Sequence, residues 1–493
     1  MGAVSRRDFS ILFEKLPKAS ILLRDSWAYE EAVFVGNLLY RMKSPAAVVQ
    51  AINEEDVRVT VEFAKAHNLP LSVKSGGHSN AAYCLNQDGI VLDMRSMNKV
   101  KVDKDAMEIT IGGGAQWKHV YHELYNKDPS LIVVGGQCPT VGASAFTMGG
   151  GLSPFSRCYG LGIDNLVEVT LITANGVSVT VTNNEDNPDK SKLFWALRGG
   201  GGGNFGIVTK LKTKLHHLRE PDGTVVCGNL SWEIPVEEES FNKMMDVWNK
   251  GHWPEEVCAD AVWRYKQNQL YAEMTIIYNG RKEACDRDLA PILKYVENKN
   301  NTLKPMKWWN WVVEDIAFSV RSKLYHHHAS FIFPEHGITS DVTSLMTKWM
   351  QRVRNYEPNH EKCTSHILWD HIGGATTNFE TGATAFPWRD GAYVCSGKAG
   401  YINYIDNKLE NWQEAYYGAN YQKLRCIKSH WDPTNFFHFD QSIEPVDYCH
   451  SQPDWESWEK YAVPTPTLLG DAEAADDIYA ANARIRSDML SHQ

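Results

Sequence analysis

The amino-acid sequence predicts an α+β protein with two main lobes. Its 493 residues exceed what one hydrophobic core accommodates, and this length favours two or more lobes. Short β-rich runs joined by glycine-rich connections fill the chain as far as Leu215, whereas longer alternating runs separated by helical segments follow. We therefore expect a first lobe over residues 1–215 and a second lobe over residues 216–400.

The first lobe is predicted to begin with a helix followed by a strand. Val57, Val61 and Ala64 recur at the spacing of one helix face, which predicts a helix over residues 57–67. The segment 69–79 has the pattern of a strand that runs into a glycine turn. A further helix is expected at 117–124, among short strands at 89–94, 107–114, 131–136, 166–173 and 177–182.

The second lobe is predicted to contain a sheet with helices on one face. Long alternating runs at 225–234 and 262–278 indicate strands, and helices are expected at 241–248, 282–295 and 340–354. The other face of such a sheet is free to meet a ligand. Residues 401–450 form a C-terminal segment with a helix at 416–427, and residues 451–493 form a polar tail.

Charge, hydropathy and cysteine spacing exclude several classes of protein. The formal net charge of −10 opposes binding to nucleic acid, and no apolar run approaches the roughly 20 residues of a membrane span. The ten cysteines have no CxxC pair or other metal-ligand spacing, so we expect no metal site. His326, His327 and His328 do not change this, because adjacent residues of a strand point to opposite faces.

The scattered cysteines indicate reduced thiols, and hence a cytoplasmic protein, which we expect to be a monomer. Two N-glycosylation sequons, at Asn229 and Asn300, keep secretion open as the alternative. Arg6 and Arg7 resemble a twin-arginine export signal, but charged residues interrupt the apolar stretch that should follow.

Three glycine-rich segments carry the strongest chemical signal in the first lobe. They are SGGHS at 75–79, a stretch with scarcely any charge at 135–166, and a third segment at 193–215. One such turn alone is typical of an ordinary loop, but three together suggest a long ligand lying against backbone amides. The run GGGGGNFG at 199–206 is not a dinucleotide-binding fingerprint, because a strand comes after it and no helix opens from it.

These motifs together resemble those of the berberine bridge enzyme-like FAD-linked oxidases. The resemblance extends from about Arg41 to Pro445 and rests on the following motifs in the family's order: SGGHS, GGQCPTVGASAFTMGGG, YGLGIDNL, FWALRGGGGGNFGIV, YINY and DPTNFFHFDQSI. It implies a PCMH-type FAD-binding domain, a substrate domain with an antiparallel sheet backed by helices, and a segment 401–450 that returns to the FAD domain.

The resemblance also implies which residues hold the FAD. His78 would bond covalently to the 8α-methyl group of the flavin and Cys138 to its C6, whereas Ser75, Gly76 and Gly77 would hold the diphosphate. The alternative is that His78 and Cys138 have only structural roles. The other positions implied in cofactor binding are Ser79, Val141, Gly142, Gly149, Gly150, Gly151, Asp164, Asn165, Gly203, Gly206, Ile207, Val208, Tyr401 and Asn403.

In this family, the residue three positions after the linking cysteine is thought to control access of dioxygen to the flavin. That residue is Val141 here, and a side chain smaller than leucine favours an oxidase over a dehydrogenase. The alternative interpretation is that Val141 only packs in the core.

At the substrate end, a base must take the hydroxyl proton of an alcohol, so we expect a tyrosine with a lowered pKa or a carboxylate. The motif YINY at 401–404 implies Tyr404 as this base, although strand aromatics in a core are the alternative. The acidic residue that relatives often carry would fall near Cys395, where no acid is present. Glu380 and Asp390 are the nearest carboxylates that could substitute for it.

The sequence therefore predicts an FAD-dependent oxidase that acts on a small alcohol, with a sugar hydroxyl as one candidate, and reduces dioxygen to hydrogen peroxide. A natural-product oxidative cyclase shares every flavin motif and is the first alternative. A non-redox cyclase or binding protein with a structural flavin is the second.

Overall fold

The computed structural model describes residues 9–24, 26–183, 186–266, 268–314, 329–353, 365–395 and 400–446. All of them belong to the first of the two units into which the chain divides, Met1–Asp447 and Tyr448–Gln493. The predicted polar tail, the three consecutive histidines and the side chain of Cys395 lie outside the described part. No helix in that part is long and apolar enough to cross a membrane.

A four-stranded sheet opens the chain. Its order is β1 (Ser20–Leu23), β2 (Ala47–Gln50), β4 (Ile90–Asp93) and β3 (Leu71–Lys74), with β2 and β3 parallel to β4. Helix α3 (Glu54–Ala66) begins at Asn53, whose side chain accepts a hydrogen bond from the Asp56 amide. This helix and β3 confirm the predicted helix-to-strand unit, and β3 leads directly into the glycine turn at 75–79.

A five-stranded antiparallel sheet follows, in the order β5 (Val100–Asp103), β6 (Glu108–Gly112), β10 (Ile207–Lys214), β8 (Leu166–Ile172) and β9 (Ser178–Thr182). Helices α4 (Trp117–Lys127), α5 (Ala143–Met148) and α7 (Pro188–Leu197) share its hydrophobic core. The strand predicted at 131–136 is only the short β7 (Leu131–Ile132), which pairs with β11 (His216–His217).

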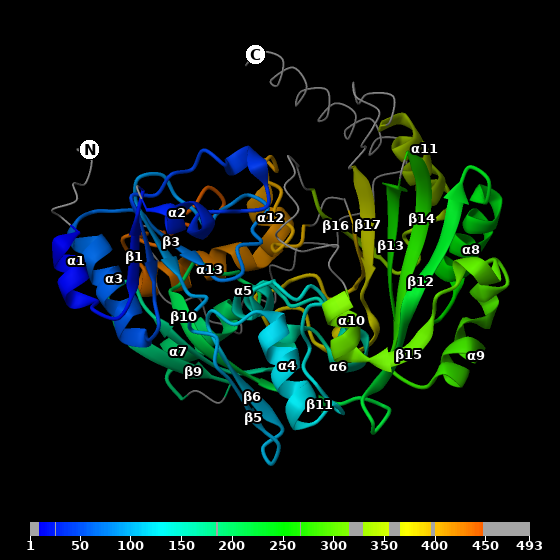
Figure 1. Ribbon diagram of the computed structural model, residues 1–493, viewed down its shortest axis with the longest axis horizontal. Coiled ribbons are helices and arrows are strands. Elements are labelled where there is room, and N and C mark those ends of the chain that lie inside the picture. The colour runs from blue at the N-terminus through cyan, green and yellow to red at the C-terminus, as the bar shows by residue number, and fades with distance from the viewer. Residues whose placement is uncertain are drawn as a thin grey trace. The chain divides into compact units, whose positions relative to one another are not determined.

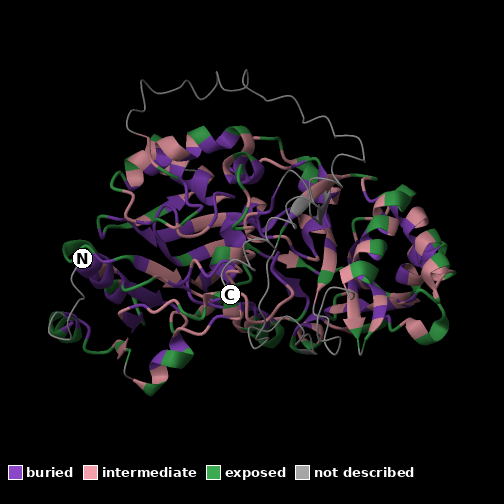
Figure 2. Cartoon of the chain, turned by 90° about the horizontal axis from the view of Figure 1, so that it is seen from above, coloured by how far each residue is buried: buried purple, intermediate pink, exposed green. Residues whose placement is uncertain are grey.

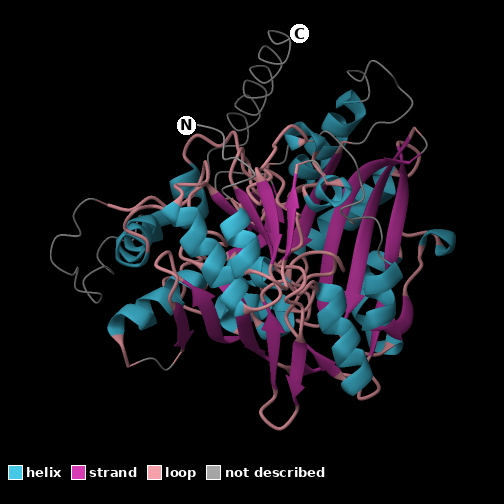
Figure 3. Ribbon diagram, turned by 60° about the vertical axis from the view of Figure 1, so that its left-hand side comes forward, coloured by secondary structure: helices cyan, strands magenta, loops and turns pink. Residues whose placement is uncertain are grey.

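The seven-stranded antiparallel sheet has the order β15 (Lys304–Lys307), β12 (Thr224–Ile234), β14 (Gln269–Tyr278), β13 (Val257–Lys266), β17 (His366–His371), β18 (Gly391–Cys395) and β16 (Phe331–Pro334). Helices α8 (Glu238–Lys250), α9 (Lys282–Leu293) and α11 (Ser340–Val353) lie along one face of its long strands (Figures 1 and 3). Strands and helices of this sheet bury a common apolar core, seen as purple ribbon in Figure 2. The predicted sheet with helices on one face is confirmed.

Two further predicted elements differ from the observed ones. The run at 262–278 is the antiparallel hairpin β13–β14, and Asn268 at its turn has a φ of 68°, a conformation that asparagine tolerates. The helix predicted at 416–427 is divided, because Gly418 has a φ of 49° between α12 (Trp412–Tyr417) and α13 (Tyr421–Trp431). The remaining elements are α1 (Ser10–Lys15), α2 (Trp27–Ala32), η1 (Leu38–Tyr40), α6 (Ser156–Tyr159), η2 (Gly162–Asp164), η3 (Asn298–Asn300), α10 (Trp308–Glu314), η5 (Gly374–Asn378) and η6 (Gly418–Asn420).

The thiol state is mixed. Six of the described cysteines are free: Cys84, Cys138, Cys158, Cys227, Cys258 and Cys285. Cys426 in α13 is disulfide-bonded, so the expectation of reduced thiols throughout the chain is wrong at this position.

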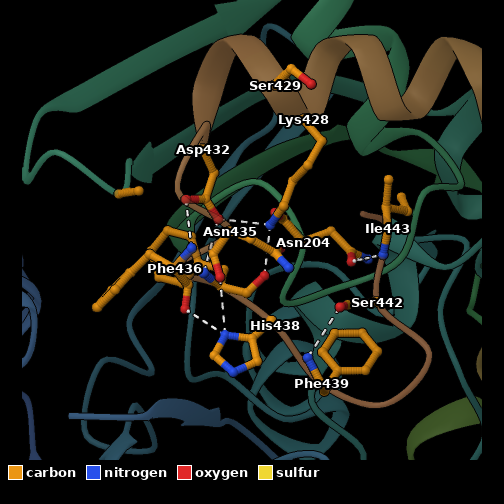
Figure 4. Close-up of polar contacts among 12 residues, drawn as sticks. Asn204, Lys428, Ser429, Asp432, Asn435, Phe436, His438, Phe439, Ser442 and Ile443 are labelled. Carbon is orange, nitrogen blue, oxygen red and sulfur yellow. Dashed lines mark hydrogen bonds and ion pairs between the residues drawn. The ribbon is translucent and has the colours of Figure 1, made fainter. Parts of the chain in front are cut away.

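A buried ion pair joins the C-terminal segment to the third glycine-rich motif. Lys428 Nζ lies 2.7 Å from Asp432 Oδ2, and neither side chain is exposed (Figure 4). The same ammonium group donates to the carbonyl oxygens of Asn204 and Phe437, while Asn204 Oδ1 accepts the amide of Ile443. Residues 421–443 are thereby held against the loop that precedes β10.

Replacement of Lys428 by methionine leaves the Asp432 carboxylate buried without its cation. We expect Lys428→Met to lower the free energy of unfolding by about 3–5 kcal/mol, measured by urea denaturation. Lys243→Met is the matched control, because Lys243 and Glu239 form an ion pair of the same i,i+4 spacing that is exposed to solvent. Equal stability of the two variants would contradict the anchoring role of Lys428.

Candidate active site

The first two glycine motifs meet with their backbones in contact. A Cβ atom added to Gly76 would lie 2.4 Å from the Gly142 nitrogen and 2.6 Å from the Thr140 oxygen. One added to Gly142 would lie 2.3 Å from Ser75 Oγ. Gly77 has a φ of 74°, which also favours glycine. The turn after β3 and the loop 138–142 can therefore approach this closely only because these positions have no side chain.

This contact brings His78 and Cys138 to the same hydroxyl group. His78 Nε2 lies 2.8 Å from Thr140 Oγ1, and Cys138 Sγ lies 3.6 Å from that oxygen. Burial lowers the pKa of His78 to about 4, so the imidazole is neutral at pH 7 and one ring nitrogen keeps its lone pair. Both side chains are only partly buried, as is Val141, three residues after the cysteine.

The YINY motif holds the glycine loop at 149–152. The hydroxyl oxygen of Tyr401 accepts the amides of Gly151 and Leu152, each at 3.1 Å, and Asn403 Nδ2 donates to it at 2.9 Å. A Cβ atom on Gly149 would lie 2.1 Å from Asn403 Oδ1, and one on Gly150 would lie 2.9 Å from the Tyr401 ring. Tyr401 and Asn403 thus fix the backbone of this loop.

Asp164 and Asn165 use their side chains within the protein. Arg389 donates two hydrogen bonds of 2.8 Å to the carboxylate oxygens of Asp164, and both side chains are almost completely buried. Asn165 donates to the carbonyl oxygens of Tyr159 and Leu161. Asp164 therefore connects the loop 159–165 to Arg389, and Asn165 connects it to β10, because its carbonyl oxygen accepts the Thr213 hydroxyl.

The remaining predicted cofactor positions surround these loops. Ser79 Oγ accepts the amide of Tyr83, and Gly203 has a φ of 81° next to the Phe439 ring. A Cβ atom on Gly206 would lie 2.6 Å from Leu171 Cδ1. Ile207 and Val208 are buried at the start of β10.

A chain of polar side chains connects Tyr404 to the loop that carries Cys138. The Tyr404 hydroxyl donates to Asp370 Oδ2 at 3.0 Å, and Asp370 on β17 lies directly opposite Asp260 on β13. Gln137 Nε2 donates to Asp260 Oδ2 at 3.1 Å, and Trp311 Nε1 donates to Gln137 Oε1 at 2.8 Å. The sheet and the glycine-rich lobe therefore contribute to one polar network.

The electrostatics of this network differ from the sequence-based expectation. Burial and the neighbouring Asp370 raise the pKa of Tyr404 well above 10, so the expectation of a tyrosine with a lowered pKa is wrong. Burial raises the pKa of Asp370 to about 6, while the hydrogen bond from the Tyr404 hydroxyl opposes that rise. Near pH 7, Tyr404 is thus a neutral hydroxyl that faces an ionised carboxylate.

Sequence reasoning missed Asp370 and Asp260. Glu380 and Asp390, the carboxylates that the sequence offers as substitutes, are exposed, whereas Asp370 is hydrogen-bonded to Tyr404. The available signal was an acidic residue inside each of two largely apolar strands, HILWDH and VCADAVW.

Trp308 belongs to the core, where its ring contacts Tyr121 and Phe155.

Two family models match the chain, in the order in which the motifs occur. The model described as FAD binding domain matches residues 45–182, and the model described as Berberine and berberine like matches residues 400–444. The chain belongs to the berberine bridge enzyme-like family of FAD-linked oxidoreductases. The first matched segment contains His78 and Cys138, and the second contains Tyr401.

Relatives of this berberine bridge enzyme-like protein cover nearly its whole length. Xylooligosaccharide oxidase from Thermothelomyces thermophilus is 28% identical over 88% of this chain and 94% of its own. Reticuline oxidase from Papaver somniferum is 24% identical over 82% of this chain and 84% of its own.

Solved structures confirm the predicted fold of an FAD-binding domain with an antiparallel-sheet substrate domain. The wild-type pollen allergen Phl p 4, a glucose dehydrogenase, superposes with a TM-score of 0.75 at 20% identity and covers 90% of this chain and 100% of its own. A variant of Phl p 4 with valine in place of one isoleucine is a glucose oxidase and superposes with a TM-score of 0.73 at 20% identity, with the same coverage.

Proposed function

We propose that this FAD-linked oxidoreductase is an oxidase that removes hydride and a proton from an alcohol. The observation that carries the proposal is the hydrogen bond from the Tyr404 hydroxyl to Asp370, in a network that reaches the loop of Cys138. In this proposal, residues 1–215 hold the cofactor, residues 216–400 supply the substrate wall, and residues 401–450 return to the FAD domain.

The residues present fit a covalently held FAD. The turns at Gly76 and Gly142 bring two stretches of glycine backbone into close contact, and such glycine turns suit a diphosphate, which backbone amides can bind. His78 and Cys138 share the hydroxyl of Thr140, and their proposed attachment points, the 8α-methyl group and C6, belong to the same ring of the flavin. When bound, FAD accepts the hydride from the alcohol carbon and passes its two electrons to dioxygen, which leaves as hydrogen peroxide.

Tyr404 and Asp370 provide a path for the hydroxyl proton. Because Tyr404 is protonated at neutral pH, it can take a proton from the substrate only by giving up its own. The hydrogen bond to Asp370 Oδ2 directs that proton to an ionised carboxylate. The substrate O–H bond thus breaks as a Tyr404 O–H bond forms, and the original Tyr404 proton ends on Asp370.

A sugar hydroxyl is the substrate class that we favour. This choice is supported by two similar proteins that act on sugars: xylooligosaccharide oxidase, and Phl p 4, which is a glucose dehydrogenase. The alternative, an oxidative cyclase acting on a natural product, has its support in the similarity to reticuline oxidase. Peroxide release from a panel of sugars, compared with phenolic and alkaloid substrates, distinguishes the two. A flavin that stays oxidised with every substrate would instead indicate a non-redox protein.

We also propose that Val141 leaves a path for dioxygen to the flavin. Val141 is partly buried in the loop of Cys138. Wild-type Phl p 4 is a glucose dehydrogenase, whereas its variant with valine in place of one isoleucine is a glucose oxidase. This difference supports a role for a small side chain in the use of dioxygen.

If FAD is attached through two covalent links, the flavin should stay with the protein after denaturation. After acid precipitation, the yellow colour should remain in the pellet, and His78→Ala or Cys138→Ala should each retain one link, detected as flavin mass on the intact chain. The double variant should release all flavin. Cys158→Ala, at another partly buried free cysteine, is the control and should keep both links. Complete release from the unmutated protein would refute covalent attachment.

Enlargement of residue 141 should slow oxygen use selectively. We expect Val141→Leu to reduce the rate of reoxidation by dioxygen at least about tenfold, a barrier increase of ~1.4 kcal/mol, with substrate-driven reduction nearly unchanged. Val141→Ala should keep the oxygen rate. Stopped-flow absorbance measures both half-reactions, and an equal loss in the two would mean that Val141 only packs.

Removal of the Tyr404 hydroxyl should impair the reductive half-reaction. We expect Tyr404→Phe to lower the anaerobic reduction rate at least about a hundredfold, because a positioned proton acceptor contributes roughly 10²–10⁴-fold. Asp370→Asn should act in the same direction, since it removes the proton acceptor of Tyr404. Tyr265→Phe is the control, because that hydroxyl donates to the Met350 carbonyl. Near-normal reduction in Tyr404→Phe would transfer the role to another residue.

A further inference from the structure

Three side chains that commonly bind metals converge where the chain after α8 meets the turn after β16. Glu335 Oε1 lies 3.9 Å from His252 Nδ1 and 3.9 Å from His336 Nε2. The ligand atoms of all three residues lie within 4.8 Å of one another, and no other group of three histidine, cysteine or acidic side chains converges in this way within the described residues. A separation of 3.9 Å is longer than a hydrogen bond, so the three atoms face one another without bonding directly.

A backbone carbonyl group orients the ring of His336. His336 Nδ1 is hydrogen-bonded to the carbonyl oxygen of Asn249, the penultimate residue of α8. A carbonyl oxygen can only accept, so Nδ1 carries the proton and Nε2 of the neutral imidazole presents its lone pair on the side of Glu335. Metal-binding histidines commonly have this arrangement, in which the second ring nitrogen donates to a carbonyl oxygen.

The turn that carries Glu335 and His336 has a defined backbone. The Gly337 amide donates to the Pro334 carbonyl oxygen at 3.0 Å, which closes a four-residue turn. His336 occupies the third position of this turn with a φ of 63°, a conformation that glycine and asparagine adopt more readily. A histidine at such a position points to a function of its side chain beyond the turn itself.

The chain around His252 is also fixed. The Trp253 ring stacks on the Trp248 ring with centroids 4.6 Å apart, and Trp253 Nε1 donates to the Trp248 carbonyl oxygen at 2.8 Å. Lys250, two residues before His252, forms an ion pair of 2.7 Å with Asp246, which offsets its positive charge. The backbone therefore presents His252 beside Glu335 without an unpaired lysine next to it in the chain.

The ligand set suits a divalent transition-metal ion. Imidazole nitrogens favour Zn²⁺, Cu²⁺ or Ni²⁺, whereas Mg²⁺ and Ca²⁺ prefer oxygen ligands. Zinc bonds of about 2.0–2.1 Å place neighbouring ligands of a tetrahedron about 3.4 Å apart. The observed separations of 3.9 Å need only a small closure, which exposed side chains can make by rotation. Three protein ligands leave the fourth position of a tetrahedral ion to water.

We propose that His252, Glu335 and His336 bind one divalent transition-metal ion, which links the chain after α8 to the turn after β16. Strand β16 lies at the edge of the seven-stranded sheet, beside β18, so the link would hold an edge strand in place. The expectation of no metal site came from cysteine spacing and from the consecutive histidines, and neither reports on ligands from two segments far apart in the chain. The site is independent of the proposed oxidation.

Isothermal titration calorimetry with zinc chloride tests the site. The titration uses the full chain with His326, His327 and His328 replaced by alanine, so that these three histidines do not bind zinc as well. We expect one zinc ion per chain. His336→Ala and Glu335→Gln should each weaken zinc binding at least about tenfold, because the loss of a direct ligand costs no less affinity than the loss of a residue that orients one.

The matched control is His430→Ala. His430 is an exposed histidine that lies 3.8 Å from one carboxylate oxygen, that of Asp189. This variant should keep the zinc affinity of its parent chain. An unchanged affinity in His336→Ala, or an equal loss in His430→Ala, would overturn the proposal. Should the chain with three alanines not fold, the same comparison of His336→Ala with His430→Ala in the unmutated chain is decisive.

Hydrogen exchange followed by mass spectrometry tests the link between the two segments. With zinc at ten times its dissociation constant, amide exchange that requires the link to open should slow about tenfold in residues 251–253 and 334–337. The protection should be lost in His252→Ala. Protection of one segment alone would overturn the link, because the ion would then be held without the other segment. Neither measurement depends on reduction of the flavin, so failure of the proposed oxidation would leave both results standing.

Discussion

The geometry of the site depends on the hydrogen bonds that the guanidinium group of Arg157 donates to two strands of the seven-stranded sheet. Arg157 Nε donates to the Val257 carbonyl at 2.8 Å, and Nη1 donates to the Ile372 carbonyl at 2.9 Å. These acceptors lie three residues before Asp260 and two residues after Asp370, and Arg157 itself follows the glycine loop at 149–152. One buried cation with a rigid fork of donors therefore sets the two carboxylate-bearing strands against the FAD-binding lobe. Burial and this cation lower the pKa of His371, so the imidazole is neutral and accepts from Arg157.

A second constraint is the absence of side-chain volume where the glycine loops meet. The backbone contact between Gly76 and Gly142 brings His78 and Cys138 to the hydroxyl of Thr140, although the residues are about sixty positions apart in the chain. Any larger residue at either glycine would separate the two loops by forcing the backbone apart. The chemistry proposed for the histidine and cysteine thus depends on neighbours that take no part in it.

Buried ion pairs complete the assembly by tying late segments of the chain to early ones. Asp164 receives both hydrogen bonds of Arg389, and Lys428 with Asp432 holds the C-terminal segment to Asn204. A buried charge without its partner strongly destabilises the folded state, so such pairs favour the one arrangement of segments in which both partners meet. Asp164 illustrates the result: a residue expected at the cofactor from its motif has its side chain engaged by Arg389.

The sequence alone determined the glycine-rich motifs and the α+β fold, because these depend on patterns among residues that are close together in the chain. It also led to Tyr404 as the expected base, through the resemblance of the YINY motif. It could not identify Asp370 or Asp260. Each is a single acidic residue in an apolar strand, and their partnership depends on the register of β13 against β17 and on the docking of the loops that carry Gln137 and Tyr404. The raised pKa of Tyr404 likewise comes from burial and from a carboxylate 34 residues away. Only the tertiary structure decides such properties, since desolvation and charge proximity act through space and not along the chain.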